Sequence, residues 1–411
     1  MFKIIGPPVR FKTVFDQFKD DFTKPSHKSM TQLAGAVIGM DKNRTVRRLH
    51  RMLSKKERKS RTAYEYFFNE ARWDEDEVAQ RKADLFFEAS KVEKGDRLFL
   101  IIDDTYQEKK GDKTQGVGRF YDHSKNRWIE GNCFVTSALQ AGEVYILHKA
   151  KMYLKEESAE EMGESFRTKI DIAYEDIVKP LAVPEGVMLY VIHDSWWYKK
   201  EFIMGARDSG HHIVCRLKSD KKVFWDGREI SVKEFASELS GQYQRVEIKV
   251  RGKQKEYLAA ECVVGLEGVG EVRAVVSKTG EDSVPKFYMT TDLELTLEGV
   301  LEIYENRWNI ETAHREGNQK FGFKDYMIRE KRAIERFMQL TFMAWAVIVI
   351  AKLRGDGDIH RVIGDLNLGG ILEETQVEMM VETYLHYRTI LTDISLSKEE
   401  KAERLIDLFM E

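Results

Sequence analysis

Cysteine is scarce in this 411-residue sequence, which contains only Cys133, Cys215 and Cys262. They lie far apart and form no C-x-x-C pair, so the sequence indicates neither a zinc ribbon nor a disulfide framework. A reducing cytosol is therefore the expected compartment. A large excess of one charge is also absent, since the net charge is only −3 and no overall basic field marks a polyanion-binding protein. The phosphate-binding loop G-x-x-x-x-G-K-[ST] does not occur, which argues against an ATP-driven motor.

Long hydrophobic runs are few as well. The N-terminal stretch lacks the apolar core of a secretory signal. The best membrane candidate, residues 337–353, is interrupted by Gln339 and Thr341 and falls short of about 18 clean apolar residues. We therefore expect a buried helix in this place and no membrane partner.

The composition is that of an ordinary globular protein, with 42% hydrophobic and 33% charged residues, and the length allows two or three domains. The basic residues are concentrated, because residues 41–61 contain ten Lys or Arg and only two acids. Residues 44–53 have helical periodicity, with Val46, Leu49 and Leu53 on one face. The candidates for phosphate contact are Arg44, Arg47, Arg48 and Arg51. A solvated helix surface is the alternative that this pattern leaves open.

The order of the predicted elements indicates a mixed α/β fold. Residues 1–95 and 370–411 are predicted to be helical. Apolar runs predict strands at 98–102, 116–121, 133–139, 144–148, 187–193 and 212–217. Further helices are predicted to end near Pro180 and to cover 199–209, 297–321 and 333–353. Residues 218–295 alternate with period two and contain frequent glycine, which predicts a β-rich block.

Two of the apolar runs end in aspartate. Asp103 and Asp104 follow residues 97–102, and Asp194 follows the strand predicted at 187–193. Carboxylates at strand ends are held rigidly, as hard metals require, and Glu311 adds a third from a predicted helix. Such a set suits two Mg²⁺ ions, or Mn²⁺, and a pair of these ions clamps the attacking and leaving oxygens of a phosphoryl transfer. We predict Asp103, Asp194 and Glu311 as catalytic, with Asp104 as a further possible ligand.

The helix predicted at 297–321 carries charged and aromatic residues on one face. Tyr304, Arg307, Glu311 and Arg315 fall at i, i+3, i+7 and i+11. The carboxylate suits a metal, and the guanidinium groups suit phosphate. An intrahelical salt-bridge ladder at i,i+4 spacing is the alternative.

Two tryptophans follow the second aspartate. Trp196 and Trp197 are candidates for stacking on an unpaired base or for core packing, and Trp308 offers the same choice.

These motifs together resemble the DDE transposases of bacterial insertion sequences, in the branch marked by Y-x2-R-x3-E-x6-K. Tyr304, Arg307 and Glu311 match that signature, while Asn318 stands where the family has lysine. Residues 102–105 resemble the first-aspartate motif, and residues 191–194 resemble the second. In the family's fold a D-x-T pattern favours Asp103 over Asp104 as the ligand, and neighbouring strand residues point to opposite faces. The resemblance covers roughly residues 30–350.

The resemblance implies an RNase H-like catalytic core with an inserted β-rich domain and a helical N-terminal DNA-binding domain. The expected boundaries are 1–95 for the DNA-binding domain, 96–217 for the first part of the core, 218–295 for the inserted domain, 296–355 for the completion of the core and 356–411 for a C-terminal helical segment.

The activity implied is cleavage at the ends of the protein's own mobile element and joining of the 3′ ends to target DNA. Double-stranded DNA, as terminal repeats and target, is the expected partner, together with a second copy of the chain. A prokaryotic cytoplasm, in contact with the nucleoid, is the expected location. A nuclease of the same fold without integration activity, or a transposase-derived repressor, is the alternative.

Overall fold

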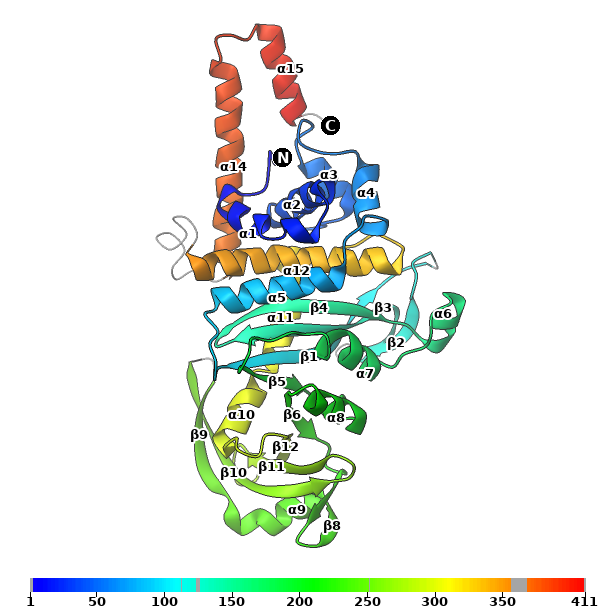
Figure 1. Cartoon of the computed structure of the whole chain (residues 1–411), viewed down its shortest axis with the longest axis vertical. Coiled ribbons are helices and arrows are strands. Elements are labelled where there is room, and N and C mark those ends of the chain that lie inside the picture. Colours follow the sequence, from blue (N-terminus) through cyan, green and yellow to red (C-terminus); the bar gives the residue numbers. More distant parts are fainter. Residues whose placement is uncertain (1–2, 112, 123–125, 251, 356–367, 410–411) are drawn as a thin grey trace.

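The computed structural model describes residues 3–111, 113–122, 126–250, 252–355 and 368–409. Residues 356–367, at the start of the predicted C-terminal segment, lie outside this range. The molecule is elongated, with the terminal helices at one end, a sheet across the middle and a β-rich block at the other end (Figure 1). The mixed α/β fold predicted from the sequence is confirmed.

The first 95 residues form short helices, as their periodicity predicts. Thr23, Thr45, Ser60 and Asp74 each accept a hydrogen bond from a backbone N–H in the first turn of the helix that follows, which fixes where four of the helices begin. The elements are η1 (Val9–Phe11), α1 (Lys12–Asp16), η2 (Lys19–Asp21), α2 (Lys24–Ile38), α3 (Val46–Met52), α4 (Arg61–Asn69) and α5 (Glu75–Ala89).

The helix α12 (Lys331–Arg354) lies between α1–α4 and the sheet, and α5 runs beside it on the sheet side (Figure 1). Within the described residues it is the single helix long and apolar enough to cross a membrane, but 89% of its most apolar window is buried inside the protein. It packs against α1, α2 and α4 on one side and against α5 and β4 on the other. The prediction of a buried helix at 337–353 is confirmed.

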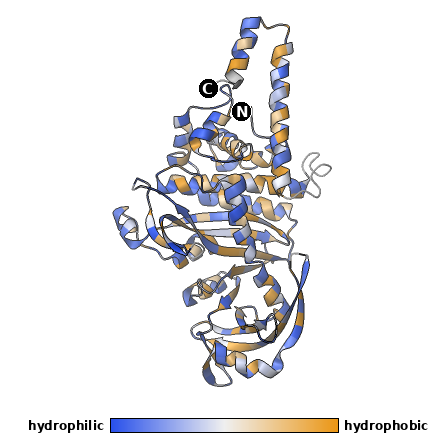
Figure 2. Cartoon of the chain, turned by 180° about the vertical axis from the view of Figure 1, so that it is seen from behind, coloured by the Kyte–Doolittle hydropathy of each residue, from blue (hydrophilic) through white to orange (hydrophobic). Residues whose placement is uncertain are grey.

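The first half of the sheet contains three parallel strands at its centre. Its strands are β1 (Arg97–Glu108), β2 (Gly118–Asp122), β3 (Arg127–Ala141), β4 (Val144–Tyr153), β5 (Met188–His193) and β6 (His212–Leu217). β5 runs parallel to both β1 and β6, while β3 is antiparallel to β1 and also pairs with β2 and β4. Hydrophobic residues dominate the sheet, whereas α14 (Leu368–Thr392) mixes hydrophobic and polar residues (Figure 2).

The β-rich block at 218–295 extends this sheet. Its strands are β7 (Lys222–Trp225), β8 (Arg228–Ser231), β9 (Gln244–Val250), β10 (Lys253–Leu266), β11 (Gly270–Lys278) and β12 (Lys286–Thr290), with α9 (Val232–Glu238) and η4 (Leu239–Gln242) between them. β12 pairs antiparallel with β6, from Phe287 opposite Leu217 to Thr290 opposite Val214. A single twelve-stranded sheet therefore joins the block to the first half.

The remaining helices connect and cover the strands. They are α6 (Glu156–Glu161), α7 (Lys169–Ile172), η3 (Ala173–Val178), α8 (Lys200–Asp208), α10 (Leu297–Glu305), α11 (Trp308–Glu316), η5 (Gly317–Phe321) and α15 (Lys398–Phe409).

The prediction of one helix over 297–321 is wrong, because α10 and α11 are separated at Asn306 and Arg307. Four backbone hydrogen bonds, from the N–H groups of residues 306, 307, 309 and 310, reach three residues back instead of four. α11 then passes into the π-turn η5.

Candidate active site

The sequence predicted Asp103 at the end of a strand, but Asp103 lies within β1. β3 pairs with β1 from Leu98 as far as Glu108, whereas β5 pairs with it only from Arg97 to Ile101. On the β5 side, the edge of β1 is therefore not covered by β5 beyond Ile101. Asp103 and Asp104 stand on this stretch of the strand.

Asp194 follows directly after β5 and lies beside Asp103. Ile101 and Ile192 are partners in the parallel ladder, so two residues further on Asp103 and Asp194 reach the same level and the same face of the sheet. Asp194 Oδ1 accepts a hydrogen bond of 2.8 Å from the backbone N–H of Trp196, a local turn that follows the end of β5.

Asp104, the next residue on β1, is engaged by Lys169 of α7. The Lys169 ammonium forms an ion pair with Asp104 and donates a hydrogen bond to the hydroxyl of Tyr106, 3.1 Å away. The Tyr106 hydroxyl in turn donates to Asp104 over 3.1 Å. Asp103 and Asp104 therefore have different environments, and the carboxylate of Asp104 already has a cation.

Arg307 and Glu311 approach Asp103 from α11 and the break before it. Arg307 Nη2 lies 2.8 Å from Glu311 Oε1, and its Nη1 lies 3.9 Å from Asp103 Oδ2. The Arg307 side chain is 13% exposed and Glu311 is 43% exposed. The i,i+4 ion pair expected as the alternative on this helix is thus present, and it stands at the edge of the site.

These groups open into one pocket of about 680 Å³. It is lined by Asp103, Asp104, Thr105, Tyr106, Asp122, Lys169, Asp194, Trp196, Arg307, Glu311, His314 and Lys324. The fold thus brings all three predicted catalytic carboxylates to one cavity. In the described part of the chain, no three His, Cys, Asp or Glu side chains stand close enough together to hold a metal ion as they are.

The charge distribution of the pocket fits a divalent cation. Burial, together with the neighbouring Asp104 and Asp194 carboxylates, raises the pKa of Asp103 to about 7, although the backbone N–H of Asp104 and the guanidinium of Arg307 act to lower it. A cation bound between Asp103 and Asp194 would relieve this repulsion and offer the oxygen coordination that Mg²⁺ prefers. Glu311, more exposed and held by Arg307, would have to turn away from the guanidinium to join them.

Two residues of the predicted helix face do not line the pocket. Tyr304 is only 6% exposed and packs edge-on against Tyr288, with ring centroids 4.8 Å apart. Arg315 is exposed outside the pocket. The predicted shared face assumed one unbroken helix, and the break at Asn306–Arg307 removes that assumption.

The pocket also contains cations that the sequence analysis missed. Lys324, in the turn after η5, donates a hydrogen bond of 2.7 Å to Thr105 Oγ1 on β1. His314 lies nearby, where its Nε2 is 2.7 Å from Thr136 Oγ1, and burial together with Lys324 lowers its pKa to about 3. No helical spacing from Glu311 indicates Lys324, because the chain leaves the helix at Gly322, a left-handed residue with φ of 64°.

The four arginines predicted to contact phosphate have two different environments. Arg47, Arg48 and Arg51 are exposed on α3. Arg44 is 1% exposed and lies before α3; its guanidinium donates to the carbonyls of Val37, Met40 and Lys320. The predicted DNA contact of Arg44 does not fit this structure, because its side chain is used inside the protein.

The tryptophans also differ. Trp197 is 1% exposed and belongs to the core, whereas Trp196 is 50% exposed at the pocket and Trp308 is 48% exposed.

Comparison with known proteins gives two family matches. Residues 15–258 match the family described as DDE superfamily endonuclease, and residues 173–347 match the transposase DDE domain. The first range contains Asp103 and Asp194, and the second contains Asp194 and Glu311. Neither description specifies the branch marked by Y-x2-R-x3-E-x6-K. No curated protein matches the sequence.

Proposed function

Since the chain belongs to the DDE superfamily of endonucleases, we propose that it is a DNA transposase that cleaves at the ends of its own mobile element and joins the 3′ ends to target DNA. One observation carries the proposal. Asp103 on β1 and Asp194, directly after the neighbouring parallel strand β5, reach the same level, and Glu311 and Arg307 face the same pocket. The proposed fold of this region is an RNase H-like core completed by α10, α11 and α12.

Asp103, Asp194 and Glu311 are the proposed ligands of two Mg²⁺ ions, with Mn²⁺ as a substitute. When bound, such ions polarise the scissile phosphodiester and activate the attacking water or 3′-hydroxyl. Asp104 is the weaker candidate, because its ion pair with Lys169 would have to break first.

The cations around the carboxylates have a complementary role. Arg307 reaches the pocket from the α10–α11 break, and Lys324 reaches it from the turn after η5. They would hold a DNA phosphate in the pocket, and Arg307 would exchange Glu311 for that phosphate when the substrate binds. Tyr304 supports Arg307 from the core.

Recognition of the element's ends is assigned to α3. Its exposed arginines are Arg47, Arg48 and Arg51. The major groove of DNA is wide enough to accept such a helix. Arg315 offers a further exposed cation on α11. The chain would act on DNA in a prokaryotic cytoplasm.

A homodimer on DNA is proposed because two ends must be joined. The support lies on α14, which extends away from the body of the molecule (Figure 1) and exposes an apolar stripe. Its members are Val377, Met380, Val381, Tyr384, Leu385 and Leu391. This spacing of three and four residues is that of a helix-pairing face.

The test is cleavage of DNA that spans the borders of the protein's own gene, with and without Mg²⁺. Wild-type protein should nick at specific border positions, and Asp194→Asn should not. The matched control is Asp292→Asn, because the Asp292 carboxylate binds the Tyr190 hydroxyl at 2.6 Å outside the pocket. Cleavage that persists in Asp194→Asn would remove the active-site assignment.

Strand joining separates the transposase from the alternatives. Pre-cut border ends incubated with a plasmid should become covalently linked to it through their 3′ ends. Cleavage without joining would leave the nuclease alternative. Binding to the borders without cleavage by any of the proteins would leave the repressor.

A further inference from the structure

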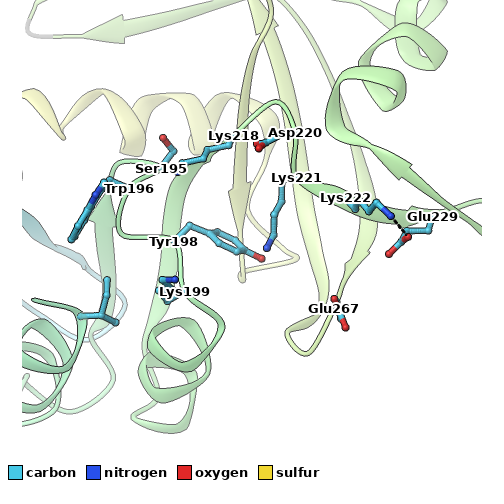
Figure 3. A pocket seen from close by; sticks show the side chains of 11 residues that line it. Ser195, Trp196, Tyr198, Lys199, Lys218, Asp220, Lys221, Lys222, Glu229 and Glu267 are labelled. Atoms are coloured by element: carbon cyan, nitrogen blue, oxygen red, sulfur yellow. Dashed lines mark hydrogen bonds and ion pairs between the residues drawn. The ribbon is translucent and has the colours of Figure 1, made fainter. Parts of the chain in front are cut away.

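A second cavity, of about 600 Å³, lies beside the catalytic pocket and is not used in the proposed mechanism. It is formed by the loop between β5 and α8, the turn between β6 and β7, the strand β8 and the turn before β11 (Figure 3). We call it the lysine cleft. Its lining residues include Trp196, Tyr198, Lys199, Lys218, Lys221 and Lys222.

The lysine cleft adjoins the catalytic pocket at Trp196. Trp196 lines both cavities, two residues after Asp194, and half of its surface is exposed. On the catalytic side its ring lies 5.1 Å from the Lys169 ammonium, and one ring edge packs against the buried Trp197. A chain that leaves the carboxylates past Trp196 would therefore enter the lysine cleft.

The lysines of the cleft that have no acidic partner give it a positive charge. Lys222 is paired with Glu229 at 2.7 Å, and Asp220 and Glu267 also line the cavity (Figure 3). Among the residues that the structure describes, no ion pair joins Lys199, Lys218 or Lys221 to an acid. The Lys221 ammonium lies 4.3 Å from the centre of the Tyr198 ring, which holds the charge at the cavity wall.

Exposed lysines along a groove with an accessible aromatic ring are the chemistry that binds a single nucleic-acid strand. The lysines meet successive phosphates, and the ring stacks on a base without regard to its identity. Stacking requires a base that is unpaired, so a closed duplex would not use the exposed face of Trp196.

We propose that the lysine cleft holds one DNA strand where it leaves the catalytic pocket, with Lys199, Lys218 and Lys221 at its phosphates and Trp196 stacked on an unpaired base next to the cut. This assignment rests on the proposed function, since it takes the substrate of the catalytic pocket to be DNA.

The test measures binding of wild type, Lys218→Gln/Lys221→Gln and Lys222→Gln to fluorescent border DNA. One set of substrates carries a single-stranded extension at the cut, and the other is a closed duplex of equal length. All assays contain Ca²⁺ or EDTA, so that cleavage plays no part. Lys222→Gln is the matched control, because its charge is already paired with Glu229.

The double variant should bind the extended substrate at least tenfold more weakly, with little change on the closed duplex and none in the control. The slope of log affinity against log salt should become shallower by about 1.4, at roughly 0.7 for each lost phosphate contact on a single strand. Equal binding by the double variant and wild type would overturn the cleft assignment. The proposed function would still stand in that case if wild type cleaved the borders and Asp194→Asn did not. Absence of DNA binding by wild type would overturn both.

A second readout tests Trp196. With 2-aminopurine as the unpaired base next to the cut, wild type and Trp196→Phe should quench its fluorescence by stacking, and Trp196→Ala should not. Identical fluorescence in all three proteins would remove the stacking role.

Discussion

At the scale of single residues, the candidate site is a group of neighbouring carboxylates whose negative charge is partly balanced by cations. Asp103 has the most unfavourable position, because it is partly buried beside Asp104 and Asp194 and its nearest guanidinium is 3.9 Å away. Asp104 has the opposite situation, with the Lys169 ammonium bound directly to it. The charged Asp103 carboxylate therefore lowers the stability of the folded protein, whereas the Asp104 carboxylate raises it.

We expect Asp103→Asn to stabilise the protein in EDTA, and more at pH 8 than at pH 5. The folded-state pKa of Asp103, about 7, is above its usual 3.8, so the folded protein binds more protons than the unfolded chain between these values. The wild-type protein therefore loses stability as the pH rises from 3.8 to about 7, and the asparagine variant, which has no carboxylate to ionise, does not. The gain at pH 8 is on the order of 2 kcal/mol after allowance for partial exposure. Thermal unfolding at the two pH values measures it.

Asp104→Asn is the control and should change stability in the other direction. Removing this carboxylate leaves the nearly buried Lys169 without its anion, which costs about 2–3 kcal/mol. If the two variants shift the melting temperature alike, the distinction between Asp103 and Asp104 is wrong.

Lys324 permits a second prediction at this scale. Lys324→Gln should lower the rate of border cleavage about 100-fold, because a cation facing the phosphate is lost from a pocket partly shielded from water. Lys320→Gln provides the comparison, since Lys320 is paired with Glu316 at 3.2 Å and does not line the pocket. Single-turnover cleavage assays measure both. Equal rates for Lys324→Gln and wild type would exclude Lys324 from phosphate binding.

At the scale of elements, the sequence predicted the strands that local apolar patterns encode. It missed the features that depend on pairing with distant segments. Apolar runs placed β5 and β6 correctly, within a residue. The extension of β1 through Asp103 to Glu108 was missed, because that stretch is polar and is held as a strand by pairing with β3. The break before α11 was missed because Asn306 and Arg307 keep helical dihedral angles, and only the hydrogen-bond pattern changes.

The same distinction explains which site residues could be found. Asp103, Asp194 and Glu311 sit next to recognisable runs and motifs, so the sequence could place them in one candidate site. Lys169 begins the four-residue helix α7 and Lys324 lies in the turn after η5, and only the folded chain brings them to the pocket. Arg44 was misassigned because a basic run does not reveal which of its members turns inward.

Arg44 provides the prediction for this scale, since it links the segment before α3 to η5. Its guanidinium donates to the Lys320 carbonyl, and its backbone N–H donates to Asp325 Oδ2 over 2.8 Å. Arg44→Met should lower the free energy of unfolding by about 2–4 kcal/mol, because several buried carbonyls lose their donor. Arg48→Met, at an exposed position, should change it by less than about 0.5 kcal/mol. Urea unfolding distinguishes the two, and similar values for both would refute the structural role of Arg44.

At the scale of the whole molecule, the continuous sheet decides how independent the predicted domains are. Residues 218–295 were expected as an inserted domain, yet β12 belongs to the same hydrogen-bonded ladder as β6. The ladder continues through β5 to β1, so backbone bonds connect the block to the strand that carries Asp103.

We therefore expect the β-rich block and the first half of the sheet to open together. Amides of β12 and β6 should exchange hydrogen with opening free energies that agree within about 1 kcal/mol, because neither strand can leave without exposing the other. Native-state hydrogen exchange with mass spectrometry measures this. Much faster exchange throughout β10, β11 and β12 than in β5 and β6 would indicate a block that unfolds by itself.

The unequal length of β1 and β5 has a consequence for how such a site can change over time. The pocket that contains Asp103 and Asp194 is a notch beyond the end of β5, and the loop after Asp194 forms part of its wall through Trp196. Insertions or deletions among residues 195–199 would resize the notch, while the ladder between Arg97 and Ile101 and its partners on β5 would be preserved. Such a chain can acquire a different substrate geometry through loop changes alone, with Asp103 and Asp194 kept at the same level.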